Sequence, residues 1–186
     1  MGKRQDIMDA TLDLIHEEGL QSVTLAKVLK KAKVGWGTTF NYFESKEVLI
    51  NEVYKESRIH MGNYLMQNYN EHLTVYEKFK ILQTNRINYG LEHPKEFLFI
   101  DLYSYSPLIP ASLRDFDAAG STNAVQSMIL EGQKTGLIKS IDPHLCHQLI
   151  HGIIHSVVRG YLINKYPFDD LQIQQTIEAS WKAIQQ

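Results

Sequence analysis

The chain has 186 residues, of which 44% are hydrophobic and 22% are charged, a balance typical of a folded globular protein rather than a disordered or fibrous one. No apolar run approaches the roughly 18 residues of a membrane-spanning helix, and no secretory signal is visible before the first amphipathic segment. A single cysteine, Cys146, excludes an intramolecular disulfide and fits a reducing compartment, so we expect a cytoplasmic protein.

Hydrophobic residues recur at helical spacing along the whole chain, and no segment has the period of a strand, so the predicted fold class is all-α. Thr24, Ser45 and Thr74 are suitable N-caps, and Asp142-Pro143 combines a capping acid with a proline in the first turn. An interruption near Gly120 is compatible with the pattern. In chain order, we expect helices over residues 4–19, 25–32, 36–42, 45–72, 74–92, 95–104, 111–135, 143–166 and 169–185.

The net charge of −2 hides a basic segment near the start of the chain. Between Thr24 and Lys46 there are five lysines and one acid, Glu44, which gives this segment a charge of +4. A basic patch on a mildly acidic protein favours a polyanionic partner for that segment alone. Charge by itself would also fit a solvated helix face, so the surrounding pattern has to decide.

Two short helices joined by a tight turn, after a first helix and before a long one, are typical of a helix-turn-helix. The residues in this region resemble the TetR family of bacterial regulators. The resemblance rests on the opening helix before Gly19, on the stretch from Gly37 to Leu49, and on four positions that match the family's signature: Thr24, Val28, Ala32 and Val34. These matches cover about 45 residues, and their joint spacing is specific.

Three residues depart from the family's usual pattern. Leu29 stands where alanine is usual, Lys33 where glycine is usual, and Gly35 where serine or threonine is usual. A lysine at a turn position that favours positive φ implies modest backbone strain. Gly35 also lacks a side chain that would cap the following helix. These differences affect the local turn geometry and leave the helix-turn-helix prediction in place.

The resemblance implies a subunit in two parts. Residues 1–46 would form a three-helix DNA-binding head, and residues 47–186 a larger helical body for ligand binding and dimerisation, with about nine helices in all. It further implies a repressor without catalytic activity or cofactor, which binds an inverted-repeat operator as a homodimer. Recognition helices of such a dimer lie about 34–36 Å apart, or one turn of DNA.

We predict two kinds of DNA contact in the head. Lys46, Thr24 and Tyr42 are placed to hold phosphates, since cations and helix N-termini attract anions. Base edges would be contacted from the short third helix, in which asparagine suits adenine and threonine suits several bases. The predicted DNA-binding residues are Thr24, Gly35, Trp36, Thr38, Thr39, Asn41, Tyr42 and Lys46.

Aromatic and methionine side chains in the body indicate a pocket for an apolar or amphipathic small molecule. The same residues would also serve as ordinary hydrophobic core. The predicted ligand-binding residues are Met61, Tyr64, Phe99, Tyr103, Tyr105, Met128, His151 and His155. For the dimer interface we predict a stripe on the last helix together with two residues of its predecessor: Val157, Tyr161, Ile173, Ile177, Trp181 and Ile184.

Four histidines, His144, His147, His151 and His155, fall in a stripe about 80° wide on one helix. Spacing of four residues allows two histidines to share a metal ion, so the alternative hypothesis is a helical-bundle metal carrier or enzyme. No acidic residue or cysteine joins the stripe, which favours pocket or interface histidines instead. A third hypothesis is a regulator that binds a partner protein rather than DNA, and salt-dependent binding to duplex DNA would count against it.

Overall fold

The computed structural model describes residues 2–35, 37 and 42–186. Over these residues the regular structure is helical, and the one strand-like feature is an isolated antiparallel bridge between Ile138 and Gln185. The predicted all-α class is therefore confirmed. In the same part of the chain, no helix combines the length and the apolar character needed to cross a membrane.

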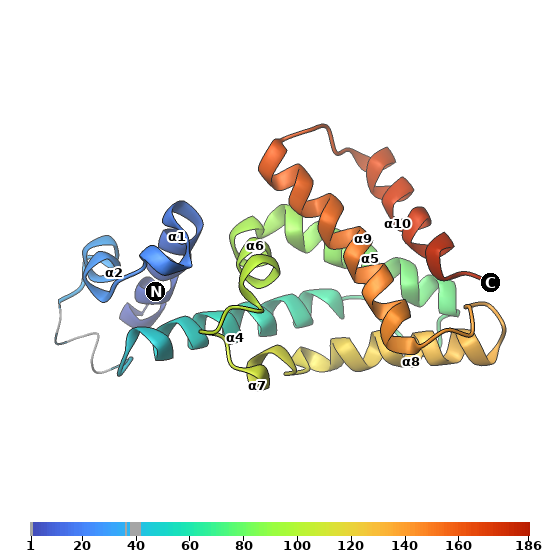
Figure 1. Cartoon of the computed structure of the whole chain (residues 1–186), viewed down its shortest axis with the longest axis horizontal. Helices are drawn as coiled ribbons and strands as arrows, with labels where there is room; N and C mark the ends of the chain where they lie inside the picture. Colours follow the sequence, from blue (N-terminus) through green and yellow to red (C-terminus); the bar gives the residue numbers. More distant parts are fainter. Residues whose placement is uncertain (1, 36, 38–41) are drawn as a thin grey trace. The chain divides into compact units, whose positions relative to one another are not determined.

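The chain divides into two compact units, each of which is described by itself. Unit 1 comprises residues 1–58 and 95–116, and unit 2 comprises residues 59–94 and 117–186. The division falls inside α4 (Lys46–Leu65) and at the start of α6 (Pro94–Tyr103), so both helices contribute to each unit (Figure 1).

Unit 1 begins with α1 (Lys3–Glu18), which packs against α2 (Leu25–Ala32). Gly19 ends α1 at a φ of 82°, a conformation that a residue with a side chain rarely adopts. Thr24 then caps α2, and its hydroxyl accepts a hydrogen bond from the amide of Lys27 at 3.3 Å. The unit also contains α4 up to Arg58, α6 from Lys95, the 3-10 turn η1 (Leu20–Ser22) and the short helix α7 (Ala111–Arg114).

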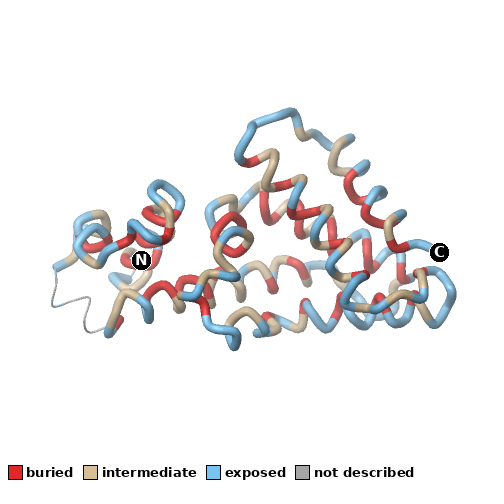
Figure 2. The backbone as a smooth tube through the Cα atoms, in the orientation of Figure 1, coloured by how far each residue is buried: buried red, intermediate tan, exposed pale blue. Residues whose placement is uncertain are grey.

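Unit 2 is a helical bundle of α5 (Val75–Glu92), α8 (Ser121–Lys134), α9 (Pro143–Asn164) and α10 (Asp170–Ile184). Helix α5 packs against the other three, and α9 also packs against α8 and α10. Buried positions recur along these helices (Figure 2). The sequence specifies the helix starts locally, because side chains cap three of them: Thr74 for α5, Asp142 for α9 and Asp169 for α10.

One predicted helix boundary was wrong. Helix α4 ends at Leu65 rather than near His72, because the chain turns through Asn68, which adopts a φ of 60° that asparagine tolerates. The interruption anticipated near Gly120 is present, because the predicted helix over residues 111–135 is divided into α7, the 3-10 turn η2 (Ala118–Gly120) and α8. The break follows from positive φ at Ala119 and Gly120, and the carboxylate of Asp117 accepts hydrogen bonds from the first amides of α8.

Candidate nucleic-acid interface and effector region

Of the eight predicted DNA-binding residues, the structure describes Thr24, Gly35, Tyr42 and Lys46. Thr24 and Gly35 are exposed, and so is Tyr42, with 46% of its surface accessible. The adjacent Phe43 is fully buried, and the guanidinium of Arg4 lies 5.6 Å from the centre of its ring. Four predicted base-contacting residues lie outside the described residues: Trp36, Thr38, Thr39 and Asn41.

The start of α4 offers a cation beside a helix N-terminus. Lys46 is its first residue, and the hydroxyl of Ser45 accepts a hydrogen bond from the amide of Val48 at 3.2 Å. A hydrogen bond from its own backbone amide and one from Ser45 hold the pKa of Glu47 below its usual value. Because this carboxylate already accepts hydrogen bonds at the N-terminus of α4, Lys46 is the residue that supplies positive charge at this end of the helix.

Two of the five lysines in the basic segment are paired within the head. Lys27 lies 2.6 Å from the carboxylate of Glu18, and Lys31 lies 2.7 Å from that of Glu17. The hydrogen bond to Glu17 raises the pKa of Lys31. Among the described residues, Lys30, Lys33 and Lys46 form no ion pair, so these three supply the charge available to an external anion. This pairing could have been predicted from the sequence, because α1 ends in two glutamates, Glu17 and Glu18.

The eight predicted ligand-binding residues do not all belong to one unit. Phe99, Tyr103 and Tyr105 are in unit 1, and the other five are in unit 2. Phe99 is buried with the ring of Tyr54 edge-on to it at 5.7 Å, whereas Tyr105 is 84% exposed beneath the guanidinium of Arg114. The ring of Tyr103 lies 6.0 Å from that of Phe99.

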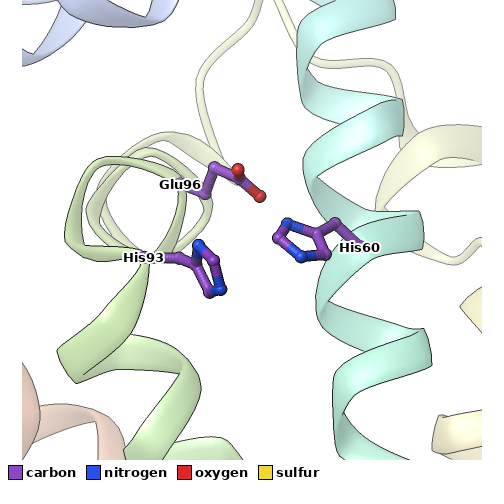
Figure 3. Close-up of side chains that lie close together, drawn as sticks. All are labelled: His60, His93 and Glu96. Atoms are coloured by element: carbon purple, nitrogen blue, oxygen red, sulfur yellow. The ribbon is translucent and has the colours of Figure 1, made fainter.

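Met61 and Tyr64 lie in the part of α4 that belongs to unit 2, next to an aromatic cluster. Its members besides Tyr64 are Tyr89, His60 and His93, with ring centres 4.4 to 5.9 Å apart. Figure 3 shows the rings of His60 and His93 close to each other; Glu96, also labelled there, belongs to unit 1. His60, Tyr89 and His93 were not among the residues predicted from the sequence, although His60 and Tyr64 are one helical turn apart.

Burial, together with a hydrogen bond to the carboxylate of Glu92, raises the pKa of Tyr64 to about 12. Tyr64 therefore stays a neutral hydrogen-bond donor at every physiological pH. The cluster therefore combines aromatic rings with polar atoms at their edges around the buried ring of Tyr89.

The remaining predicted ligand-binding residues lie deeper in unit 2. Met128 of α8 is fully buried. On α9 the rings of His151 and His155 stack at 3.7 Å with an interplanar angle of 18°. The ring of His147 lies 6.2 Å from that of His151 and nearly perpendicular to it.

Charge and geometry both disfavour a metal ion at the histidine stripe. Burial, followed by the charge of Arg86 and the neighbouring histidines, lowers the pKa of His147 to about 4. In the described part of the chain, no three of His144, His147, His151 and His155 bring ring nitrogens within 4.8 Å of one another. A guanidinium close to the stripe would also repel a second cation.

The predicted interface residues fall into two groups. Val157, Tyr161 and Ile173 are half-buried, as expected for residues at the edge of a surface. Ile177, Trp181 and Ile184 are buried in the core of unit 2, and the indole of Trp181 lies 5.0 Å from the ring of Phe79 and 5.1 Å from that of Tyr76. The exposed apolar residues on α9 and α10 are instead Leu145, Ile163 and Leu171, which the sequence analysis did not include.

Comparisons with known proteins match both parts of the chain. Residues 7–53 match the family described as "Bacterial regulatory proteins, tetR family", and residues 75–185 match "Tetracyclin repressor-like, C-terminal domain". The chain therefore belongs to the TetR family. It is a TetR-family transcriptional regulator with a helix-turn-helix head and a ligand-binding body, as the resemblance in the sequence implied.

Similar proteins extend over nearly the whole chain. The "Fatty acid metabolism regulator protein" of Bacillus subtilis is 23% identical over 178 residues, which cover 94% of this chain and 91% of that protein. A TetR family transcription regulator from Marinobacter aquaeolei has the same fold, with a TM-score of 0.87, 19% identity and coverage of 98% and 95%. The transcriptional regulator FadR from Bacillus subtilis, solved in complex with stearoyl-CoA, has a TM-score of 0.77, 22% identity and coverage of 97% and 98%.

Proposed function

We propose that this regulator binds an inverted-repeat operator as a homodimer through the segment from Thr24 to Lys46 and that it represses transcription. The single observation that supports this most strongly is the match of residues 7–53 to the TetR DNA-binding domain. The exposed capping threonine of α2 and the unpaired cation at the start of α4 fit contacts to phosphates on each side of a recognition helix.

The effector that we propose is an amphipathic compound with an acyl chain, such as an acyl-CoA. Two similarities support it: the name of the Bacillus subtilis fatty acid metabolism regulator and the stearoyl-CoA bound to FadR. The buried apolar residues of α5, α8 and α9 supply the environment that an acyl chain requires. Release from DNA requires that the effector bind one state of the dimer more tightly than the other.

The homodimer would form through exposed apolar side chains of α9 and α10. Ile163 and Leu171 are 58% and 59% exposed, which is unfavourable in water and favours contact with a second copy of the chain. In Ile163→Glu and Leu171→Glu, light scattering should show more monomer than in the parent. A parent that is monomeric at micromolar concentration would contradict the homodimer.

The DNA-binding proposal is tested by selecting a duplex from a random pool and measuring affinity at several salt concentrations. Lys46→Ala should weaken binding to all sequences and lower the salt slope by about 1, because one phosphate contact is lost. Asn41→Ala should relax the preference at one base position. Lys134→Ala, an exposed lysine at the end of α8, is the matched control and should change neither quantity. If both head variants keep the parent's affinity and selectivity, the contact assignment is wrong.

The effector proposal is tested on the same complex. Stearoyl-CoA should release the selected duplex, and coenzyme A alone should not. If no acyl compound releases the duplex, the proposed effector is wrong while the DNA-binding proposal stands.

A further inference from the structure

Arg4, in the first turn of α1, forms ion pairs with two carboxylates of α4. Its Nη1 donates to Oε1 of Glu56 at 2.6 Å, and its Nη2 donates to Oε2 of Glu52 at 3.0 Å. Glu52 and Glu56 are one helical turn apart and therefore lie on the same side of α4. The hydrogen bond to Glu56 raises the pKa of Arg4 above its usual value. Both nitrogens at the tip of the guanidinium are thus engaged within unit 1.

The same guanidinium also covers an aromatic ring next to the recognition segment, residues 36–42. It lies 5.6 Å from the centre of the ring of Phe43, a distance at which a cation is attracted to the face of an aromatic ring. Phe43 is buried, so its ring has a defined place in the core of unit 1. Arg4 therefore contacts both α4 and the residue that follows the recognition segment.

The place of Arg4 matters because α1 packs unequally against its two neighbours. Its backbone approaches that of α2 at many positions, whereas it comes near that of α4 at few. A long side chain such as that of Arg4 can bridge the wider spacing between α1 and α4. The recognition segment joins the end of α2 to the start of α4, so α1 contacts the helices on both sides of it.

Charge makes a direct contact between Arg4 and DNA unfavourable. One positive and two negative charges give the cluster a net charge of −1, which repels phosphates. A phosphate would also have to displace carboxylates that already accept hydrogen bonds from both Nη atoms. Half-exposed ion pairs contribute little to folding by themselves, but a charge held by several partners has a defined geometry. These contacts therefore favour a role for Arg4 in the placement of neighbouring elements.

We propose that Arg4 is a positioning residue for DNA recognition. By joining α1 to two glutamates of α4 and covering Phe43, it fixes the end of the recognition segment in the orientation that the major groove requires. Affinity and base preference depend on that orientation, because hydrogen bonds to base edges weaken steeply when donor and acceptor are misaligned. This inference rests on the proposed function and adds a residue outside the segment from Thr24 to Lys46.

The experiment measures the affinity of the full-length protein for the selected duplex at several salt concentrations, together with its unfolding in urea. Arg4→Gln removes the charge and both ion pairs, and Arg4→Lys keeps the charge but not the planar group that holds two partners. A double variant, Glu52→Gln with Glu56→Gln, removes both partners and leaves Arg4 in place. Lys95→Gln is the matched control, because it removes the 2.5 Å ion pair that joins Asp13 of α1 to α6.

We expect Arg4→Gln to weaken binding by about fivefold or more with an unchanged salt slope, since each head of the proposed dimer loses its orientation but no phosphate contact. Arg4→Lys should bind with an affinity between those of Arg4→Gln and the parent. The double variant should also bind more weakly, although it removes two negative charges that repel DNA. Lys95→Gln should bind as tightly as the parent, and the urea midpoint of Arg4→Gln should stay close to that of the parent.

The inference is overturned if Arg4→Gln binds as tightly as the parent or if Lys95→Gln loses the same affinity, because the ion pairs of α1 would then have no specific role in placement. A salt slope that falls by about 1 in Arg4→Gln would mean that Arg4 contacts a phosphate directly. Tighter binding by the double variant would mean that Arg4 only neutralises the two glutamates. Each of these results contradicts the inference and leaves the proposed function intact, whereas a parent that binds no duplex at low salt refutes both.

Discussion

The two units bury different kinds of polar side chain. In unit 1 the buried polar residues among those described are Thr11 and Ser57, and each hydroxyl donates to the carbonyl one turn earlier, at 2.8 Å and 2.9 Å. Unit 2 also buries the hydroxyls of Ser121, Thr176 and Ser180, which donate to nearby backbone carbonyls. In addition it buries charged and amide side chains, among them Lys78, Gln83 and Arg86. A hydroxyl that donates to a carbonyl of its own helix needs no further hydrogen-bond partner. Among the described residues, unit 2 therefore differs from unit 1 in keeping charged and amide side chains within its core.

The largest expected effect comes from removing an aromatic side chain from the core of unit 1. Phe43→Ala deletes a fully buried ring next to the predicted recognition helix and should cost about 3–5 kcal/mol of the free energy of unfolding. Urea titrations followed by circular dichroism measure this loss. DNA affinity should fall with it. A loss below about 1 kcal/mol would show that the ring is not part of a cooperative core.

The second effect is a dependence on pH that belongs to unit 2. The pKa of His147 is about 4 in the folded chain and 6.5 in its unperturbed form, so the unfolded chain binds the proton first as the pH falls. The stability that uncharged His147 contributes is therefore fully present above pH 6.5 and is lost as the pH falls from 6.5 to 4. The shift corresponds to up to about 3 kcal/mol. Urea titrations followed by the fluorescence of Trp181, in a Trp36→Phe background, measure it in unit 2.

His147→Asn is the control for this prediction, because asparagine is polar and does not titrate in this range. It should remove most of the decline between pH 6.5 and 4, whatever its effect at pH 7.5. A decline as steep as that of the parent would mean that other groups cause the acid sensitivity of unit 2.

The sequence was sufficient for features that neighbouring residues determine. The helix starts at Thr24, Thr74 and Asp142 were predicted because a cap and the amides that it binds lie within three residues of each other. The positive φ of Lys33 was likewise expected from its place in the turn, and the structure gives 55°. The end of α4 at Leu65 was missed, since asparagine at position 68 enters the left-handed region without a glycine to mark it.

Residues whose surroundings come from distant parts of the chain could be predicted less well from the sequence. Gln83 and Arg86 are types usually found on a solvated helix face, but both are buried because α5 packs against three other helices of unit 2. Lys27 and Lys31 were counted as charges available to DNA, whereas each forms an ion pair with a glutamate of α1. Three residues of the predicted dimer stripe, Ile177, Trp181 and Ile184, repeat at helical spacing because α10 packs on its own subunit. The spacing of apolar residues identifies the apolar face of a helix, but it does not show whether that face packs within the subunit or against a second copy.

A third prediction concerns the close contact between α4 and η2 in unit 2. A Cβ added at Gly62 would lie 2.3 Å from the carbonyl oxygen of Ala118 and 2.7 Å from its carbonyl carbon, so backbone would have to move. Gly62→Ala should therefore cost about 1–3 kcal/mol, measured by urea unfolding with Trp181 fluorescence. Asn63→Ala, at the exposed neighbouring position, is the control and should cost nothing. A neutral Gly62→Ala would mean that this part of α4 can shift freely.

The smallest expected effect compares one residue of the same type in each unit. Lys33 ends α2 at φ 55° and Lys165 ends α9 at φ 57°, and each amide bonds the carbonyl four residues earlier, that of Leu29 or Tyr161. Glycine adopts this conformation without the clash of a Cβ, so Lys33→Gly and Lys165→Gly should each raise the free energy of unfolding by about 0.5–1 kcal/mol. Chemical denaturation of the parent and of both variants measures the two increases in the free energy of unfolding.

Equal gains would show that the strain at Lys33 is a property of the helix end alone, because Lys165 has the same geometry outside the basic segment. The two variants should nevertheless differ in DNA binding. Lys33→Gly removes one of the three cations left unpaired among the described residues of the segment, and it should weaken binding to every duplex and reduce the salt slope. Lys165→Gly should leave both unchanged. If Lys33→Gly is more stable and binds DNA as tightly as the parent, its charge does not act on DNA, and the glycine usual at this position in the family would serve this chain equally well.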